Sequence, residues 1–211
     1  MPVRTDVSSY FSLRRMLIQI HLDLFKIERR ILCLPQPEPL TDFEILVLIL
    51  EDRRFFKHYG IDLRSVVREL VRALTFQRFG GASTIDMQLV RTATGYRQPT
   101  LRRKSYEMLL AWIIQYRYNK FDILRSYLAC AFYGSHLIGI DAAAKDVFGV
   151  WSQFELSFDQ SAELAAMLVY PRPLEPTARW RANVSRRAEY AKRLYPRLKQ
   201  GFQQVPRPEL I

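Results

Sequence analysis

The sequence has little glycine, little cysteine and no long apolar run, and each shortage excludes a class of protein. Eight glycines among 211 residues, with 49% hydrophobic residues, argue against a disordered chain or a β-sandwich and favour a mostly helical protein. The two cysteines, Cys33 and Cys130, lie among apolar residues and are expected to be buried thiols. No run of about 18 apolar residues is present. We therefore expect no single-helix membrane span, and no secretory signal is visible at the N-terminus.

Basic residues, in contrast, are abundant, and they point to a polyanionic partner. The chain carries 32 Lys and Arg against 21 Asp and Glu, a formal net charge of +11. Such a charge suits nucleic acid, an anionic membrane surface or a phosphorylated substrate. Nucleic acid is not expected, because the sequence lacks a zinc-ligand array, an RNA-binding aromatic motif and a recognition-helix signature.

Turn-forming residues divide the chain into a series of expected helices. We expect an N-terminal helix and Pro-rich linker over 1–40, a main domain over 41–200 and a tail over 201–211. Thr41 and Glu44 form a capping box that opens a helix to about Arg54. Further helices are expected in the first part of 63–79, up to Thr92 with Ser83 or Thr84 as the N-cap, and over 100–118. Others are expected from an Asn119 cap to about Tyr133 and over 142–149, 157–169 and 183–195, the last stopped by Pro196. The pattern predicts a large helical lobe with a small mobile lobe around 63–82.

The N-terminal helix has two open interpretations. Apolar residues recur at helical spacing from Leu13 to Leu32, and basic residues fill other positions. The helix either packs on the core, our preferred interpretation, or lies as an amphipathic helix on a membrane surface. Periodicity alone does not separate the two.

The segment Glu51-Asp-Arg-Arg-Phe-Phe-Lys-His-Tyr-Gly-Ile-Asp62 follows an apolar run and carries the first candidate chemistry. If the helix continues, Phe55 and His58 share the face of Glu51. A carboxylate at the end of an apolar helix, beside an aromatic ring and a histidine, can have its pKa raised towards that of a general base. The alternative is a capped helix whose acid pair, Glu51 and Asp52, is solvated.

Four further motifs follow in order. They are Gly80-Gly-Ala-Ser-Thr-Ile-Asp-Met-Gln-Leu-Val-Arg91, Arg103-Lys-x-x-Glu107, Lys120-x-x-Ile-Leu-x-x-Tyr-Leu128 with Gly134 and Gly139 after it, and Leu164-Ala-x-x-x-x-x-Pro-x-Pro173. With the first segment, they resemble the five motifs of the peptidoglycan glycosyltransferases (glycosyltransferase family 51), the lipid II polymerases. Five motifs in order are a far more specific signal than any one of them.

The resemblance implies an all-α protein with a lysozyme-like large lobe and a small mobile lobe that faces the membrane. It implies a divergent member that polymerises lipid II, a polyprenyl-pyrophosphate-linked disaccharide, by inverting transfer to a 4-hydroxyl. In that role Glu51 is the general base and Glu107 the second essential acid. On the bare sequence, Arg103 and Glu107 also fit an ion pair on a solvated helix face.

Substrate and pyrophosphate binding also follow from the resemblance. Pyrophosphate leaves as an anion, so it needs cations fixed in advance rather than an acid. The residues assigned to this binding are Phe55, Ser83, Thr84, Gln88, Arg91, Arg103 and Lys104, with Asp52 and His58 in support. No organic cofactor is implied, and a divalent cation, Mg²⁺ or Mn²⁺, is a candidate with unknown ligands. The expected location is peripheral, on the outer face of the cytoplasmic membrane, in contact with anionic lipid.

Several residues depart from the family pattern. Asp86, Met87, Thr92, Pro99 and Ala129 stand where the family usually has threonine, glutamine, asparagine, arginine and asparagine. Asp86 is unfavourable beside pyrophosphate if it points inward, unless a nearby basic residue such as Arg97 or Arg102 offsets it. Two alternatives therefore stay open: a non-enzymatic relative that binds lipid-linked precursor or membrane, and a lytic enzyme in which Glu51 is a general acid.

Overall fold

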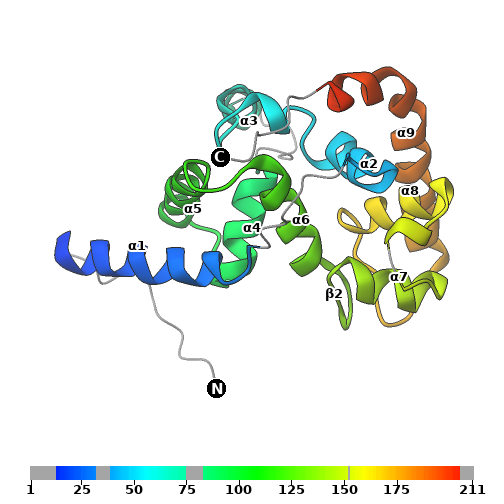
Figure 1. The fold of residues 1–211 in the computed structure, drawn as a ribbon, viewed down its shortest axis with the longest axis horizontal. Helices are drawn as coiled ribbons and strands as arrows, with labels where there is room; N and C mark the ends of the chain where they lie inside the picture. Colours follow the sequence, from blue (N-terminus) through cyan, green and yellow to red (C-terminus); the bar gives the residue numbers. More distant parts are fainter. Residues whose placement is uncertain (1–12, 32–38, 75–82, 152, 205–211) are drawn as a thin grey trace.

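The computed structural model describes residues 13–31, 39–74, 83–151 and 153–204. The described helices are α1 (Leu13–Glu28), α2 (Asp42–Glu51), α3 (Leu63–Leu74), α4 (Ile85–Thr94), α5 (Leu101–Ile114), α6 (Lys120–Cys130), α7 (Ile140–Phe148), α8 (Phe158–Met167) and α9 (Ala178–Gln203). Short 3-10 helices cover Phe55–Lys57 and Gln153–Glu155, and a hairpin joins β1 (Phe132–Gly134) to β2 (Leu137–Ile138). The predicted mostly helical, lysozyme-like fold is confirmed (Figure 1).

Some predicted features lie outside the described residues. They are the proline linker, the Gly80-Gly81 break, Cys33, the first residues of the N-terminal helix and most of the C-terminal tail. Cys130 is described, and it is a free, buried thiol as expected.

Helix α2 forms the centre of the core. Every residue from Phe43 to Leu50 is buried, which explains why this stretch is apolar on all sides rather than along one stripe. It packs against α8 and α9. The predicted capping box is present, since Thr41 accepts from the Glu44 amide and Glu44 accepts from the Thr41 amide. Arg125 of α6 neutralises the buried Glu44 at 2.8 Å.

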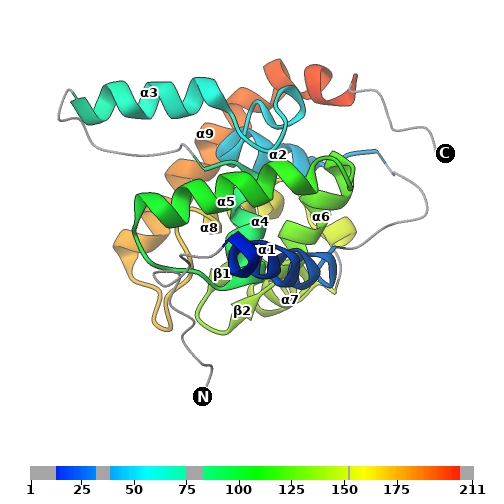
Figure 2. The same cartoon turned by 90° about the vertical axis from the view of Figure 1, so that its left-hand side faces the viewer.

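Helix α3 lies at the opposite edge of the molecule from α7 and the hairpin, as both views show (Figures 1 and 2). Its apolar residues Leu63, Val67 and Val71 recur every four residues and are more than half exposed. Arg68 and Arg72 follow the same spacing on a neighbouring face of the helix. The helix therefore presents both an apolar stripe and a basic stripe.

Helix α1 packs one face on the core and exposes the other. Leu24 and Ile27 are buried against α4 and α5, so the preferred core-packing interpretation holds for this face. Ile18, Leu22 and Phe25 form an exposed apolar stripe, and the N-terminal half of α1 projects beyond the body (Figure 1). No described helix is both long and apolar enough to cross a membrane.

Three predicted helix ends were wrong, and one of them is the end of α5, which lies at Ile114 rather than Tyr118. Helix α2 ends at Glu51 rather than Arg54, because Asp52 leaves the helical conformation with φ −154° and ψ 80°. Phe55 and His58 therefore do not share a helical face with Glu51. Helix α6 ends at Cys130, and Tyr133 lies in β1 instead of the helix.

The last helix is longer than predicted at both ends. Helix α9 begins at Ala178 and continues through Pro196 to Gln203. Proline removes one amide donor and bends a helix without always ending it. Figure 1 shows α9 changing direction near its red end. Phe202, beyond the proline, is buried, and this packing holds the last turns in place.

Candidate active site

One pocket of about 580 Å³ lies between the end of α2, helix α3, the start of α4 and helix α9. It brings together four predicted site residues that are far apart in the sequence: Glu51, Asp52, Ser83 and Thr84. Its other walls are rich in arginine. The remaining lining residues are Ile49, Leu50, Arg53, Arg54, Asp62, Ser65, Arg68, Arg72, Arg187 and Tyr190.

Glu51 is the last residue of α2 and is partly buried at this pocket. Gln88 of α4 donates its side-chain N–H to Glu51 Oε2 at 2.9 Å. Burial raises the pKa of Glu51, and the negative charge of Asp52 adds to that, while the Gln88 hydrogen bond and the Arg187 charge oppose it. The net result is a carboxyl group whose pKa lies above its ordinary value, as a general base requires.

Arg187 of α9 was not predicted from the sequence. Its Nη2 donates to the Leu50 carbonyl at 2.9 Å, and its buried Nε has no hydrogen-bond partner among the described residues. A signal was present in the sequence, because Arg187 follows Val184 by three residues and precedes Ala191 by four. Both of these neighbours are buried, so Arg187 lies on the side of the basic helix α9 that faces the core.

A second group, which we call the Glu107 cluster, consists of Ser83, Arg91, Arg103, Lys104 and Glu107. Glu107 is 0% exposed, and Arg91 and Arg103 both bind its carboxylate. Lys104 Nζ donates to Ser83 Oγ at 2.7 Å, and Arg91 Nη2 does so at 3.3 Å. The predicted residues are thus brought together, and the interpretation of a solvated helix face is wrong for Glu107.

The Glu107 cluster concentrates positive charge where solvent is partly excluded. Burial lowers the pKa of Lys104, and the nearby Arg91 charge lowers it further, while Glu107 acts in the opposite direction. The cluster contains three cations and a single carboxylate, that of Glu107, so it keeps a net positive charge. Because Ser83 also lines the pocket, an anion there can approach this charge.

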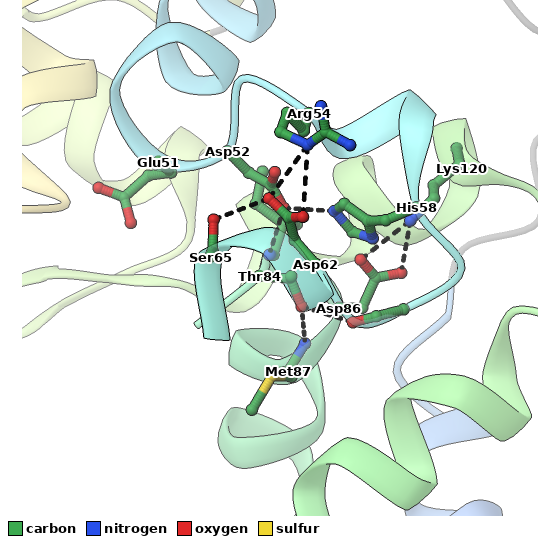
Figure 3. Close-up of polar contacts among 12 residues, drawn as sticks. Glu51, Asp52, Arg54, His58, Asp62, Ser65, Thr84, Asp86, Met87 and Lys120 are labelled. Carbon is green, nitrogen blue, oxygen red and sulfur yellow. Dashed lines mark hydrogen bonds and ion pairs between the residues drawn. The ribbon is translucent and has the colours of Figure 1, made fainter. Parts of the chain in front are cut away.

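A neighbouring group consists of the buried Asp52, His58 and Asp86 and the partly buried Lys120 (Figure 3). Asp52 Oδ2 lies 2.9 Å from His58 Nε2 and accepts from the Ile85 amide at 3.3 Å. Lys120 Nζ lies 3.0 Å from both oxygens of Asp86. Asp86 therefore points into the protein and pairs with Lys120, rather than with Arg97 or Arg102.

The same group contains three side chains of the metal-binding kind. Ligand atoms of Asp52, His58 and Asp86 lie within 4.8 Å of one another, and all three residues are buried. Both oxygens of Asp86 already bind the Lys120 ammonium, and Asp52 is held by His58 and a backbone amide. A divalent ion would have to displace the ammonium, so these residues do not fit a metal well.

Two predicted binding residues are placed differently from expectation. Phe55 is 0% exposed and lies behind the site, with Lys120 Nζ 4.3 Å from its ring centre, so it does not form the pocket surface. Thr84 is the N-cap of α4: its hydroxyl donates to the Gly60 carbonyl at 2.7 Å and accepts from the Met87 amide at 3.3 Å. Phe55 thus supports the site from within the protein, whereas Thr84 lines the pocket with its hydroxyl already engaged in these two bonds.

Known proteins similar to this chain belong to one family. A family model described as Transglycosylase matches residues 37–195. The chain is 39% identical over 130 residues to penicillin-binding protein 2a of Streptococcus pneumoniae, which covers 62% of this chain and 17% of that protein. It is 37% identical over 158 residues to penicillin-binding protein 1A of Aquifex aeolicus, covering 72% of this chain and 20% of that protein.

A third relative is matched over more of the chain. Penicillin-binding protein 1A of Rickettsia felis is 32% identical over 173 residues, which is 80% of this chain and 22% of that protein. The chain thus spans about a fifth of the length of the curated relatives it matches.

Proposed function

The chain belongs to the transglycosylase family, and we propose that it is a peptidoglycan glycosyltransferase that joins lipid II units into glycan strands. One observation carries this proposal. A single pocket contains the carboxylate of Glu51 and the hydroxyl of Ser83, and Ser83 is held by Lys104 and Arg91. A base and a pyrophosphate-binding group are the two elements that such a transfer needs.

Glu51 is proposed to act as the general base. It takes the proton from the acceptor 4-hydroxyl while that oxygen attacks the anomeric carbon of the donor. The bond from this carbon to the pyrophosphate oxygen breaks on the opposite face, so the configuration inverts and the electron pair leaves with pyrophosphate. The raised pKa of Glu51, caused mainly by burial, makes the carboxylate a stronger base than a solvated one.

The Glu107 cluster is proposed to receive the leaving group. Arg91, Arg103 and Lys104 supply charge at fixed positions, and Glu107 holds two of them in place. Ser83 Oγ accepts hydrogen bonds from Arg91 and Lys104, which leaves its own hydrogen available for a phosphate oxygen. Helix α4 begins just after Ser83, so the positive end of its helix dipole adds to this charge.

A divalent cation, Mg²⁺ or Mn²⁺, is part of the proposal as a companion of the pyrophosphate. It would be bound chiefly by phosphate oxygens and water, as is usual for Mg²⁺ with phosphorylated substrates. The protein would contribute the neighbouring charge of the Glu107 cluster, in which Glu107 is already occupied by arginine.

Membrane association is proposed for the face that carries α3. Its exposed stripe of Leu63, Val67 and Val71 lies beside Arg68 and Arg72, a combination that favours the surface of an anionic bilayer. We also propose a peripheral position on the outer face of the cytoplasmic membrane, which would bring the pocket close to a lipid-linked substrate.

The proposal is tested with purified protein and fluorescent lipid II, with Mg²⁺ or Mn²⁺ supplied in turn. Glycan polymer that a muramidase cleaves, joined with inverted configuration, is the expected product. Tight binding of lipid II without turnover would instead indicate a binding protein. Release of soluble muropeptides from purified cell walls would indicate a lytic enzyme.

A further inference from the structure

A buried tyrosine stands behind the proposed base. Tyr127 of α6 is 4% exposed, and its hydroxyl donates to Gln88 Oε1 at 2.7 Å. The same Gln88 amide donates through Nε2 to Glu51 Oε2 at 2.9 Å. Tyr127, Gln88 and Glu51 therefore form a chain of two hydrogen bonds that runs from the core to the pocket.

The orientation of the Gln88 amide decides whether its nitrogen or its oxygen faces the Glu51 carboxylate. An ionised carboxylate only accepts hydrogen bonds, whereas an amide has a donating end and an accepting end. If the amide turned over, its oxygen would face the Glu51 carboxylate, and the two negative ends would repel. Tyr127 prevents this turn, because its hydroxyl donates to the amide oxygen and keeps the nitrogen directed at Glu51.

The other groups near Glu51 cannot do the same. Asp52 disfavours the ionised carboxylate, and Arg187 favours it through its charge, with its Nη2 bonded to the Leu50 carbonyl. Tyr133 of β1 is also near, but its buried hydroxyl has no hydrogen-bond partner among the described residues. Gln88 is thus the side chain that donates a hydrogen bond to the Glu51 carboxylate, and Tyr127 holds Gln88.

We propose that Tyr127 is a positioning residue for the transfer reaction, which acts through the Gln88 amide to keep Glu51 oriented and ionised. It does not line the pocket, so it has no contact with substrate. This inference rests on the proposed function for its effect on rate, but its effect on the Glu51 carboxyl group is independent of any activity.

The first test is the steady-state kinetics of Tyr127→Phe with fluorescent lipid II. The variant keeps the ring and removes the hydroxyl. We expect kcat to fall roughly 10-fold, the upper end of the scale for one hydrogen bond between neutral groups, with KM within about twofold. Loss of the fixed donor raises the pKa of Glu51, so the acid limb of the kcat profile should move to higher pH.

Tyr133→Phe is the matched control. It removes a buried tyrosine hydroxyl from the same neighbourhood, but one without a hydrogen-bond partner among the described residues. Its kcat and acid limb should stay at the wild-type values. An equal loss in both variants would mean that Tyr127 has only a general packing role and would overturn the proposal.

A double mutant tests whether Tyr127 acts through Gln88. Gln88→Leu alone should displace the acid limb in the same direction, and Tyr127→Phe should add nothing in the Gln88→Leu background. A further loss of rate in that background would contradict the proposed route. Gln88→Leu also keeps the inference testable if Tyr127→Phe does not fold.

A direct titration separates this inference from the proposed function. The Glu51 carboxyl carbon is followed by NMR in protein labelled with ¹³C-glutamate, and Glu51→Gln assigns the signal. Tyr127→Phe should titrate at higher pH than the wild type even if neither protein polymerises lipid II. Unchanged titration overturns the inference, whereas absent turnover with shifted titration overturns only the proposed function.

Discussion

Arg91 binds both carboxylate oxygens of Glu107, with Nε 3.1 Å from Oε1 and Nη2 3.2 Å from Oε2. Arg91 lies on α4 and Glu107 on α5, so this two-point contact fixes one helix against the other. Arg103 binds the same carboxylate from one turn earlier on α5. Glu107 thereby sets the positions of two of the three cations that are proposed to receive pyrophosphate.

Glu107→Gln should damage both stability and activity. The change leaves two arginines without their shared anion beside Lys104 in a partly buried site. Breaking a buried ion pair in this way costs about 3 kcal/mol, which corresponds to a fall in Tm of roughly 6 to 12 °C. Turnover of lipid II should fall roughly 100-fold, the scale of lost electrostatic stabilisation.

Differential scanning fluorimetry and the turnover assay measure both effects. Glu28→Gln is the matched control, because Glu28 pairs with Arg117 at the surface. Exposed pairs of this kind contribute about 1 kcal/mol or less. A Glu107→Gln protein as stable and as active as Glu28→Gln would show that the Glu107 cluster has no organising role.

The contributions of Lys120 and Asp86 to the free energy of unfolding should depend on each other. Lys120→Met leaves Asp86 buried without its cation, and we expect a loss of about 3 kcal/mol in the free energy of unfolding. Asp86→Thr should restore much of that loss in the Lys120→Met background. Urea unfolding gives the free energy of unfolding of the wild type, the two single variants and the double variant. Strictly additive losses would contradict the coupling of Asp86 to Lys120.

Glu51→Gln should stabilise the protein at neutral pH. Burial raises the pKa of Glu51 in the folded state above its ordinary value of 4.5, so the folded state binds more protons than the unfolded state between the two values. Stability contributed by this group is therefore present at low pH and is lost as the pH rises through the folded pKa. Removing the charge should add about 1 kcal/mol, or about 2 to 4 °C in Tm, at pH 7.5.

The stabilisation should disappear below pH 4.5, where Glu51 is protonated in both states. Thermal unfolding of the wild type and Glu51→Gln from acid to neutral pH shows the trend. Glu175→Gln, a change at an exposed carboxylate, should give no such difference. A Glu51→Gln protein that is less stable than the wild type at neutral pH would mean that the carboxylate is favourably bound.

Arg187→Gln should move the acid limb of the rate profile to higher pH. The Arg187 charge favours ionised Glu51, so its loss raises the Glu51 pKa further and lowers the rate at neutral pH. Arg186→Gln is the control, because Arg186 is exposed and donates to Asn183 in the same helix. If both variants gave the wild-type profile, Arg187 would have no electrostatic effect on the base.

Much of the fold was predictable because its helix ends are marked by local chemistry. Thr41, Asn119 and Ser157 were each predicted to begin a helix, as was either Ser83 or Thr84, of which Thr84 is the observed N-cap. The side chain of each cap accepts from an amide in the first turn. The end of α2 was not predictable in the same way. Asp52 leaves the helix to meet His58 and the Ile85 amide, and Ile85 is 33 residues away in the sequence.

In the candidate site, too, some features were predictable from the sequence and others depend on contacts between distant residues. The resemblance to the family motifs brought Glu51, Arg91, Arg103, Lys104 and Glu107 together in the prediction, and their roles stay proposals. The partners that tune Glu51 come from other helices, namely Tyr127 of α6 and Arg187 of α9. Side-chain direction at these positions depends on tertiary packing, which a single sequence does not specify. Phe55 illustrates the converse, because its motif position does not reveal that it is wholly buried.

Whether Glu51 is the base of a glycosyl transfer can be decided by one comparison. Turnover of fluorescent lipid II is measured for the wild type, Glu51→Gln and the surface control Glu175→Gln, with lipid II binding followed in parallel. We expect polymer from the wild type and Glu175→Gln, and none from a folded Glu51→Gln protein that still binds lipid II. Polymer from Glu51→Gln at the wild-type rate would show that Glu51 is not the base.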